Sequence, residues 1–360
     1  MVCSRLFGPL PSYSGCPHPS RRKSVPPMRA PIRGTRQRRS AYAAATVLAL
    51  GLSLTACGGA STAASEVTTL KVGATTSLAG VGIRNTISSG IFKADGLSVA
   101  ASAIKSGNDA IPQLVSGGLQ VAQIDTTTAM QAIAKGIPIK IVAAAGVQST
   151  NGGDGEPSTG SVLVLPNSSI KTPADLAGKT LGVPAINNQI WMNIRIAIDD
   201  AGGDSSKVKF VEVPGAQAID LLVKGDIQAT TASEPLASSS VAAGKVRLIH
   251  STDIPNGKDQ PSSVYVATND FINKNPGTMK KFIADVYKGQ GEVNKDKELG
   301  KKVAVDQLGY KAAQLTHAFI LDYGTRAIQP AEIDAVAKNA VKYGILSSVP
   351  DTASLLATIK

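Results

Sequence analysis

The sequence predicts an α/β protein built from two similar lobes with a ligand-binding cleft between them. Strands alternate with amphipathic helices from residue 70 to 268, a pattern typical of mostly parallel sheets. One segment also recurs, because residues 110–120 read AIPQLVSGGLQ and residues 218–228 read AIDLLVKGDIQ. Each copy predicts a short helix, a glycine stop and a strand. A unit repeated only twice, at domain-like spacing, indicates two lobes rather than a solenoid, and a cleft between lobes is where small ligands bind.

The elements follow from hydrophobic periodicity and from glycine and proline stops. A proline inside the first turn after Thr172 predicts a capped helix start there. We expect strands at 70–74, 97–103, 119–124, 139–145, 161–165, 179–183, 208–213, 246–250 and 265–268. We expect helices at 83–94, 110–116, 129–135, 190–201, 276–293, 297–308, 312–321 and 330–343.

The domain boundaries are placed at the most loop-like segments of the predicted fold. The stretch 150–160, TNGGDGEPSTG, predicts a crossing between lobes, and 253–261 predicts the return. Residues 70–160 are therefore the first part of lobe one, and 161–254 form lobe two. Residues 255–360 complete lobe one and add C-terminal helices.

The N-terminus predicts an export signal over residues 1–56. These residues contain nine Lys and Arg but no Asp or Glu, and the apolar run at 41–53 is too short to span a membrane. Met28 is an alternative start, and Arg38-Arg39 leaves Sec and twin-arginine export both open. The tetrapeptide before Gly58, Leu-Thr-Ala-Cys57, resembles the lipobox of bacterial lipoproteins, which implies a diacylglyceryl group and palmitate on Cys57. Residues 57–69 are small and polar, and predict a flexible tether.

The charge and cysteine content of the mature chain exclude several functions. Without residues 1–56, the numbers of basic and acidic residues are nearly equal. We therefore expect no basic surface that binds phosphate groups and no nucleic-acid partner. Cys3 and Cys16 lie in the predicted signal, and Cys57 is the only mature cysteine. An internal disulfide and a thiolate metal site are thus excluded, and no cofactor or metal is expected.

Three further stretches carry a resemblance to a known family. They are residues 90–97 (GIFKADGL), residues 170–184 (IKTPADLAGKTLGVP) and the dipeptide Glu234-Pro235. Together with the repeat they resemble the nitrate/sulfonate/taurine group of ABC-transporter substrate-binding proteins, which includes binders of thiamine precursors. The resemblance covers residues 70–343. The loop Thr75-Thr76-Ser77 departs from it by lacking a bulky residue, and Ser233 stands where many relatives have a larger side chain.

The resemblance implies a type II periplasmic-binding-protein fold with two crossover strands. It also implies capture of a small polar solute, of the sulfonate, nitrate, pyrimidine or aromatic-acid class, and its delivery to an ABC permease. The protein would be a monomer, lipid-anchored outside the cytoplasm of a bacterium. A cell-surface sensor or adaptor with the same fold is the first alternative.

The binding site is predicted at the carboxyl ends of the strands, where helix N-termini point at a ligand. The loops there are rich in hydroxyl and amide groups, which both donate and accept hydrogen bonds. The candidate ligand-binding residues are Thr76, Ser77, Gly107, Asn108, Thr126, Thr127, Asn187, Asn188, Trp191, Gly215 and Glu234.

Several of these residues have a structural alternative. Thr126, Thr127 and Thr128 bind ligand or cap the next helix, and the same choice holds for Asn187 and Asn188. Trp191 stacks on a ligand or packs in a core. Arg84 and Arg195 lie on solvated helix faces, unless an anion binds and one of them offsets its charge.

Catalysis has little support in the sequence. No nucleophile elbow and no P-loop occur, and His250 and His317 have no partner at a recognisable spacing. We therefore expect a protein that is not an enzyme. An exported hydrolase or lyase using Glu234 remains the second alternative.

Overall fold

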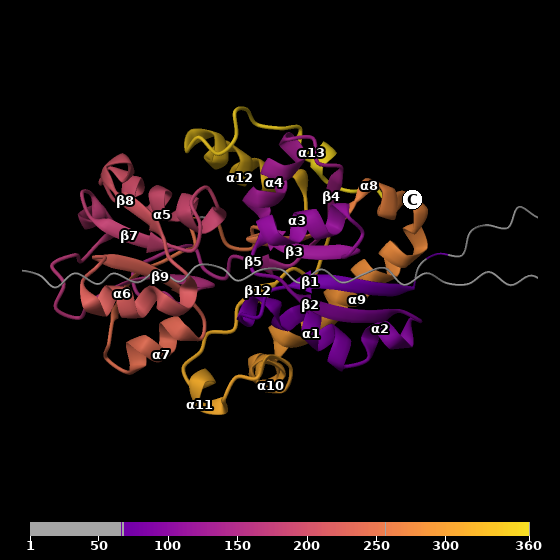
Figure 1. The fold of residues 1–360 in the computed structure, drawn as a ribbon, viewed down its shortest axis with the longest axis horizontal. Coiled ribbons are helices and arrows are strands. Elements are labelled where there is room, and N and C mark those ends of the chain that lie inside the picture. The colour runs from indigo at the N-terminus through magenta and orange to yellow at the C-terminus, as the bar shows by residue number, and fades with distance from the viewer. Residues whose placement is uncertain (1–65, 67, 256, 360) are drawn as a thin grey trace, which may run out of the picture. The chain divides into compact units, whose positions relative to one another are not determined.

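Two five-stranded sheets, each flanked by helices, form the frame of the protein in this computed structural model (Figure 1). The structure describes residues 66, 68–255 and 257–359, so the predicted signal peptide and Cys57 lie outside the described residues. Sheet one has the order β2-β1-β3-β11-β4, and sheet two has the order β10-β6-β9-β7-β8. The strands are β1 (Thr69–Ala74), β2 (Ser98–Ala103), β3 (Val121–Asp125), β4 (Ile139–Ala144), β6 (Gly160–Val164), β7 (Thr180–Val183), β8 (Lys209–Glu212), β9 (Ala229–Ser233), β10 (Arg247–Ser251) and β11 (Ser263–Thr268).

The two sheets share one pattern of strand directions. In sheet one, β1 is parallel to β2 and β3, and β11 is antiparallel to β3 and β4. In sheet two, β7 is parallel to β8 and β9, and β6 is antiparallel to β9 and β10. Each sheet therefore has one reversed strand next to an edge. We call sheet one with its helices lobe one, and sheet two with its helices lobe two. The predicted two-lobe α/β fold is confirmed, and both sheets are mixed, with four of the five strands running in the same direction.

The sequence repeat has the same structural role in both lobes. Its helices are α3 (Gly107–Val115) and α6 (Ala218–Lys224), which lead into β3 and β9. The Oε1 of Gln120 accepts a hydrogen bond from the backbone N–H of Lys71 at 2.8 Å. The Oε1 of Gln228 accepts the equivalent bond from Thr180 at 2.9 Å. The recurring glutamine thus ties each repeat to the neighbouring parallel strand.

Two chain segments connect the lobes and run beside each other. The backbone N–H of Gln148 donates to the carbonyl of Gln260 at 2.9 Å. The Oδ2 of Asp253 accepts from the backbone N–H groups of Ser149 and Thr150 at 3.0 and 2.9 Å. Short strands β5 (Gly146–Val147) and β12 (Asp322–Tyr323) pair next to them. These bonds couple both crossovers into one connection.

Two of the expected helices are shorter than predicted. The helix expected at 83–94 is divided into α1 (Val81–Ser88) and α2 (Ile91–Ala94), because Gly90 takes a left-handed φ of 78° that a helix interior does not allow. The helix expected at 312–321 ends as α11 (Ala312–Leu315). The remaining helices are α4 (Thr126–Ala134), α5 (Gln189–Asp200), α7 (Leu236–Ala242), α8 (Asn269–Lys274), α9 (Pro276–Lys295), α10 (Lys297–Leu308), α12 (Pro330–Lys342) and α13 (Thr352–Leu355).

The C-terminal helices and tail complete lobe one. Phe282 of α9 stacks on Phe92 with ring centroids 5.5 Å apart, and it meets Tyr265 of β11 edge-on. Farther along the chain, the backbone N–H of Ala357 donates to the carbonyl of Ile141 at 2.8 Å. The tail therefore lies along β4, an edge strand of sheet one. Among the described helices, none has the length and apolar character needed to cross a membrane.

Candidate functional site

A cavity of about 350 Å³ is lined by residues of both lobes and of both crossovers. Lobe one contributes the ends of β1 and β3 and the start of α3. Lobe two contributes residues after β7 and β8, the end of β9, and the first turns of α5. This position, at the carboxyl ends of parallel strands, is the one that the fold class predicts for a ligand.

Five of the eleven predicted site residues line this cavity. They are Ser77, Gly107, Asn188, Gly215 and Glu234. The other six do not line it: Thr76, Asn108, Thr126, Thr127, Asn187 and Trp191.

The threonines lie inside the first turn of α4, where the sequence predicted a loop. Asp125 caps this helix, because its Oδ1 accepts from the backbone N–H of Thr128 at 2.9 Å. Thr126 and Thr127 are fully buried, and the Thr126 hydroxyl donates to the carbonyl of Pro261 at 2.7 Å. The aspartate before the threonines therefore supplies the cap.

Asn187 and Asn188 have different roles at the start of α5. Asn188 caps the helix, since its Oδ1 accepts from the backbone N–H of Trp191 at 2.8 Å. Asn187 takes a left-handed φ of 63°, which asparagine tolerates better than most residues. Its carbonyl accepts a 2.7 Å hydrogen bond from Nε2 of Gln131 on α4. That bond crosses from lobe one to lobe two.

Trp191 and Arg195 form a stacked group away from the cavity. Trp191 packs edge-on against Phe210 with ring centroids 5.7 Å apart. The Arg195 guanidinium lies 4.8 Å from the Trp191 ring and 4.8 Å from the ring of Tyr343, which follows α12. The Tyr343 hydroxyl donates to Oδ2 of Asp199 at 2.8 Å. This group joins α5 to the C-terminal part of lobe one.

Arg84 is buried, and the expectation of a solvated helix face is wrong for it. Its Nη1 donates to the carbonyls of Thr75 and Gly80 at 2.8 and 2.9 Å. Burial lowers the pKa of its guanidinium. Thr75 lines the cavity, so Arg84 supports a loop of the cavity wall without lining the cavity itself. Arg195 does not line the cavity either.

Four buried amides line the cavity and were missed by sequence reasoning: Gln123, Gln148, Gln189 and Asn193. Gln123 lies on β3, and Gln189 and Asn193 lie one turn apart on α5. Three of their oxygens have no hydrogen-bond partner among the described residues: Oε1 of Gln123, Oε1 of Gln189 and Oδ1 of Asn193. Nε2 of Gln148 has none either, whereas its Oε1 accepts from the backbone N–H of Ile254 at 2.7 Å. Buried polar atoms normally have partners. The four-residue spacing in α5, and a glutamine inside an apolar strand, were the available signals.

Three carboxylic acids also line the cavity: Asp125, Glu234 and Asp253. Glu234 is only 4% exposed, and burial raises its pKa to about 6. Its Oε1 accepts from the Ser238 hydroxyl at 2.8 Å, and its Oε2 accepts from the backbone N–H of Phe319 at 3.4 Å. Burial also raises the pKa of Asp125 and of Asp253.

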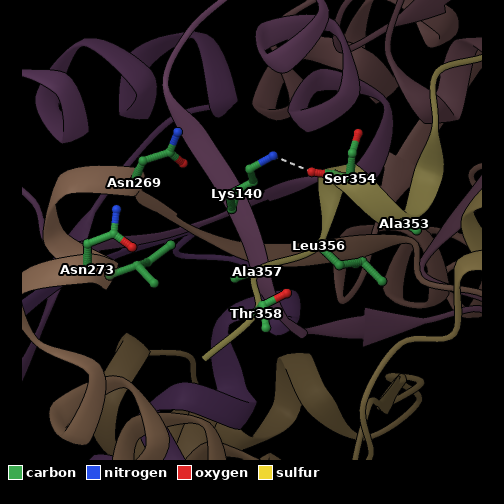
Figure 2. Close-up of a pocket in the computed structure, with 9 residues that line it drawn as sticks. Lys140, Asn269, Asn273, Ala353, Ser354, Leu356, Ala357 and Thr358 are labelled. Carbon is green, nitrogen blue, oxygen red and sulfur yellow. Dashed lines mark hydrogen bonds between the residues drawn. The ribbon is translucent and has the colours of Figure 1, made fainter. Parts of the chain in front are cut away.

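A second hollow, of about 380 Å³, lies on lobe one between β4, α8 and the C-terminal tail (Figure 2). Lys140, Asn269 and Asn273 line it, and Lys140 donates to the backbone carbonyl of Ser354. Only elements of sheet one and its tail form this hollow, so it is separate from the cavity between the lobes. Within the described ranges, no group of three or more His, Cys, Asp and Glu is placed to hold a metal ion.

Comparison with solved structures shows the same fold. The periplasmic aliphatic sulphonate binding protein SsuA of Escherichia coli matches with a TM-score of 0.65 at 17% identity, over 82% of this chain and 94% of that chain. The periplasmic nitrate-binding protein NrtA of Synechocystis PCC 6803 matches with a TM-score of 0.62 at 17% identity, over 81% and 85%.

A third similar structure is the ligand-binding component of an ABC-type import system from Staphylococcus aureus, solved with zinc bound. It has a TM-score of 0.67 at 14% identity, over 81% of this chain and 97% of that chain. The names of all three describe proteins that bind a solute or ligand. A search of curated protein sequences found no match.

The family model described as "NMT1/THI5 like" matches residues 82–298, more than half of the chain. The match begins at the second residue of α1, includes all of lobe two and all of α9, and ends at the second residue of α10. The chain therefore belongs to the NMT1/THI5-like family.

Proposed function

We propose that the protein is the extracytoplasmic solute-binding component of an ABC importer. The observation that carries this proposal is the cavity lined from both lobes, with unpartnered amide oxygens of Gln123, Gln189 and Asn193 on its wall. A solute that donates hydrogen bonds to those oxygens contacts both lobes at once. Contacts to both lobes stabilise the closed arrangement over an open one.

The similar structures support a role in uptake. One is a sulphonate-binding protein, one a nitrate-binding protein, and one a component of an ABC-type import system. The solute would be small and polar, and the partner would be the transmembrane permease that receives it. Ser77, Gly107, Asn188, Gly215 and Glu234 are the predicted residues that would contact the solute.

The anchoring part of the proposal rests on the sequence. Cys57 would carry the lipid after removal of residues 1–56, and residues 57–69 would tether the folded part to the outer face of the membrane. A Cys57→Ser variant expressed in a bacterial host should leave the membrane fraction and lose incorporation of labelled palmitate. Retention of the label in that variant would contradict the anchor.

The solute-binding function is tested by ligand screening with a conformational readout. Purified mature protein should show a rise in melting temperature with at least one small polar solute. Small-angle scattering should change with that solute if it alters lobe closure. A flat response across organic cations, alkanesulfonates, nitrate and pyrimidines would contradict the function.

A further inference from the structure

The charge on the cavity wall is unusual for a solute-binding cleft that would take an anion. Asp125, Glu234 and Asp253 line it, whereas the only Lys, Arg or His among its lining residues is Lys105. Glu234 and Asp253 are buried, at 4% and 2% exposed, and Lys105 is exposed at the rim. The wall therefore carries an excess of negative charge.

None of these three carboxylates forms an ion pair with any residue that the structure describes. Their hydrogen-bond partners are hydroxyl and backbone N–H groups, which are neutral. Buried charges in proteins are almost always paired, since an unpaired one is costly to desolvate. A positive group on the solute would supply the missing partner.

The unpartnered amide oxygens of Gln123, Gln189 and Asn193 point to the same chemistry. Oxygens accept hydrogen bonds, so they require N–H or O–H donors from the solute. Nε2 of Gln148 is the one buried side-chain donor without a partner among the described lining residues, so unpartnered acceptors outnumber unpartnered donors on the wall by three to one. Nitrate and the head group of a sulfonate carry only acceptors. Such a group would face both negative charge and acceptor atoms on this wall.

The remaining lining residues restrict the class of solute further. Its apolar part is aliphatic, including Leu78, Ile124 and Ile190, and its lining residues include no Phe, Tyr or Trp. The wall thus offers no aromatic surface for stacking a ring. The carboxylates are not grouped for a metal ion among the described residues, which leaves an organic cation with an aliphatic body.

We propose that the cleft selects a small aliphatic organic cation, an amine or guanidinium compound, over an anion. This inference rests on the solute-binding function proposed above and names its solute class. The carboxylate of Glu234 would pair with the cationic group, and the amide oxygens would accept its remaining N–H donors.

Calorimetric titration of the mature protein with three sets of probes tests the proposal. Putrescine and agmatine are the aliphatic cations, ethanesulfonate and nitrate are the anions, and 4-aminopyrimidine is the aromatic probe. We expect saturable binding of at least one cation and none of either anion. Binding of an anion or of the pyrimidine alone would leave the solute-binding function intact and overturn the cation proposal. No binding by any probe would count against both.

Two variants test the sign of the charge effect. Glu234→Gln keeps the side-chain shape and should weaken cation binding about tenfold or more. Lys105→Ala removes the one positive side chain at the rim, so cation binding should stay equal or tighten. Glu298→Gln, an exposed carboxylate on α10 with 78% of its side chain accessible, is the matched control and should change affinity less than twofold. Weaker cation binding in Lys105→Ala, or unchanged binding in Glu234→Gln, would refute the proposal.

Discussion

The side-chain amide of Gln131 donates a 2.7 Å hydrogen bond to the backbone carbonyl of Asn187, and this bond joins α4 of lobe one to the start of α5 in lobe two. A second bond, from the Tyr343 hydroxyl to Asp199, connects the same helix α5 to the chain after α12. Glu234 reaches across from lobe two to the backbone N–H of Phe319. Direct contacts between the lobes therefore exist in this structure in addition to the two crossovers.

Loss of the contacts at α5 should favour open lobes. In a Gln131→Ala/Tyr343→Phe variant, each substitution removes one hydrogen bond worth about 0.5–3 kcal/mol. We expect a larger radius of gyration by small-angle scattering and severalfold weaker solute binding, because the competent state is less populated. Gln113→Ala is the control, since among the described residues the Gln113 amide bonds to Asp109 alone, on its own helix. An unchanged radius in the double variant would show that these bonds do not control closure.

Replacement of Gln189 by leucine should weaken solute binding without lowering the stability of the fold. Its Oε1 is buried without a partner among the described residues, so an apolar side chain of similar size removes an unsatisfied acceptor. The free energy of unfolding, measured with urea, should stay equal or rise. Solute affinity, measured by titration, should fall about tenfold. A variant that loses stability and keeps its affinity would remove Gln189 from the binding site.

Glu234 should make stability depend on pH in the range around pH 6. Burial raises its pKa from 4.5 to about 6 in the folded protein. The ionised form therefore destabilises the fold by about 2 kcal/mol above pH 6, and this cost vanishes as pH falls below 4.5. Glu234→Gln should be more stable than the wild type at pH 8 and about equal at pH 4.5, as measured by chemical unfolding at both values. Equal differences at both pH values would contradict a raised pKa.

The repeated glutamines should contribute equally to stability. Gln120 and Gln228 each accept one backbone hydrogen bond from a parallel strand, at 2.8 and 2.9 Å. Substitution of either by alanine should lower the free energy of unfolding by about 1 kcal/mol. Urea titrations of both variants provide the measurement. If only one variant lost stability, the two lobes would not use the repeat in the same way.

The fold was predictable because its signals are local and strong. The glycine after each repeat helix, Gly117 and Gly225, takes a left-handed φ of 79° and 82°, as a helix stop requires. The elements that departed from expectation were governed by single residues or by tertiary contacts. Gly90 divided one helix, and Asp125 started α4 before the threonines rather than after them.

The cavity wall was harder to predict than its location. Loop residues such as Ser77 and Asn188 follow strand ends and were found by that rule. Gln123 lies inside a strand, and Asn193 lies in the second turn of a helix, where sequence alone does not show which face meets the other lobe. Trp191 was predicted at the site but does not line the cavity. It packs instead against the Arg195 guanidinium, which also lies over the ring of the distant Tyr343.

The strand-like pairing of Leu356 with Ile141, with its hydrogen bond from Ala357, has a practical consequence for handling the protein. An exposed edge strand is a template for pairing with other chains, and the tail shields β4 from that risk. Removing residues after 352, or fusing a bulky tag directly to them, would uncover this strand and promote self-association. A recombinant form of the chain is better extended through a flexible spacer than trimmed.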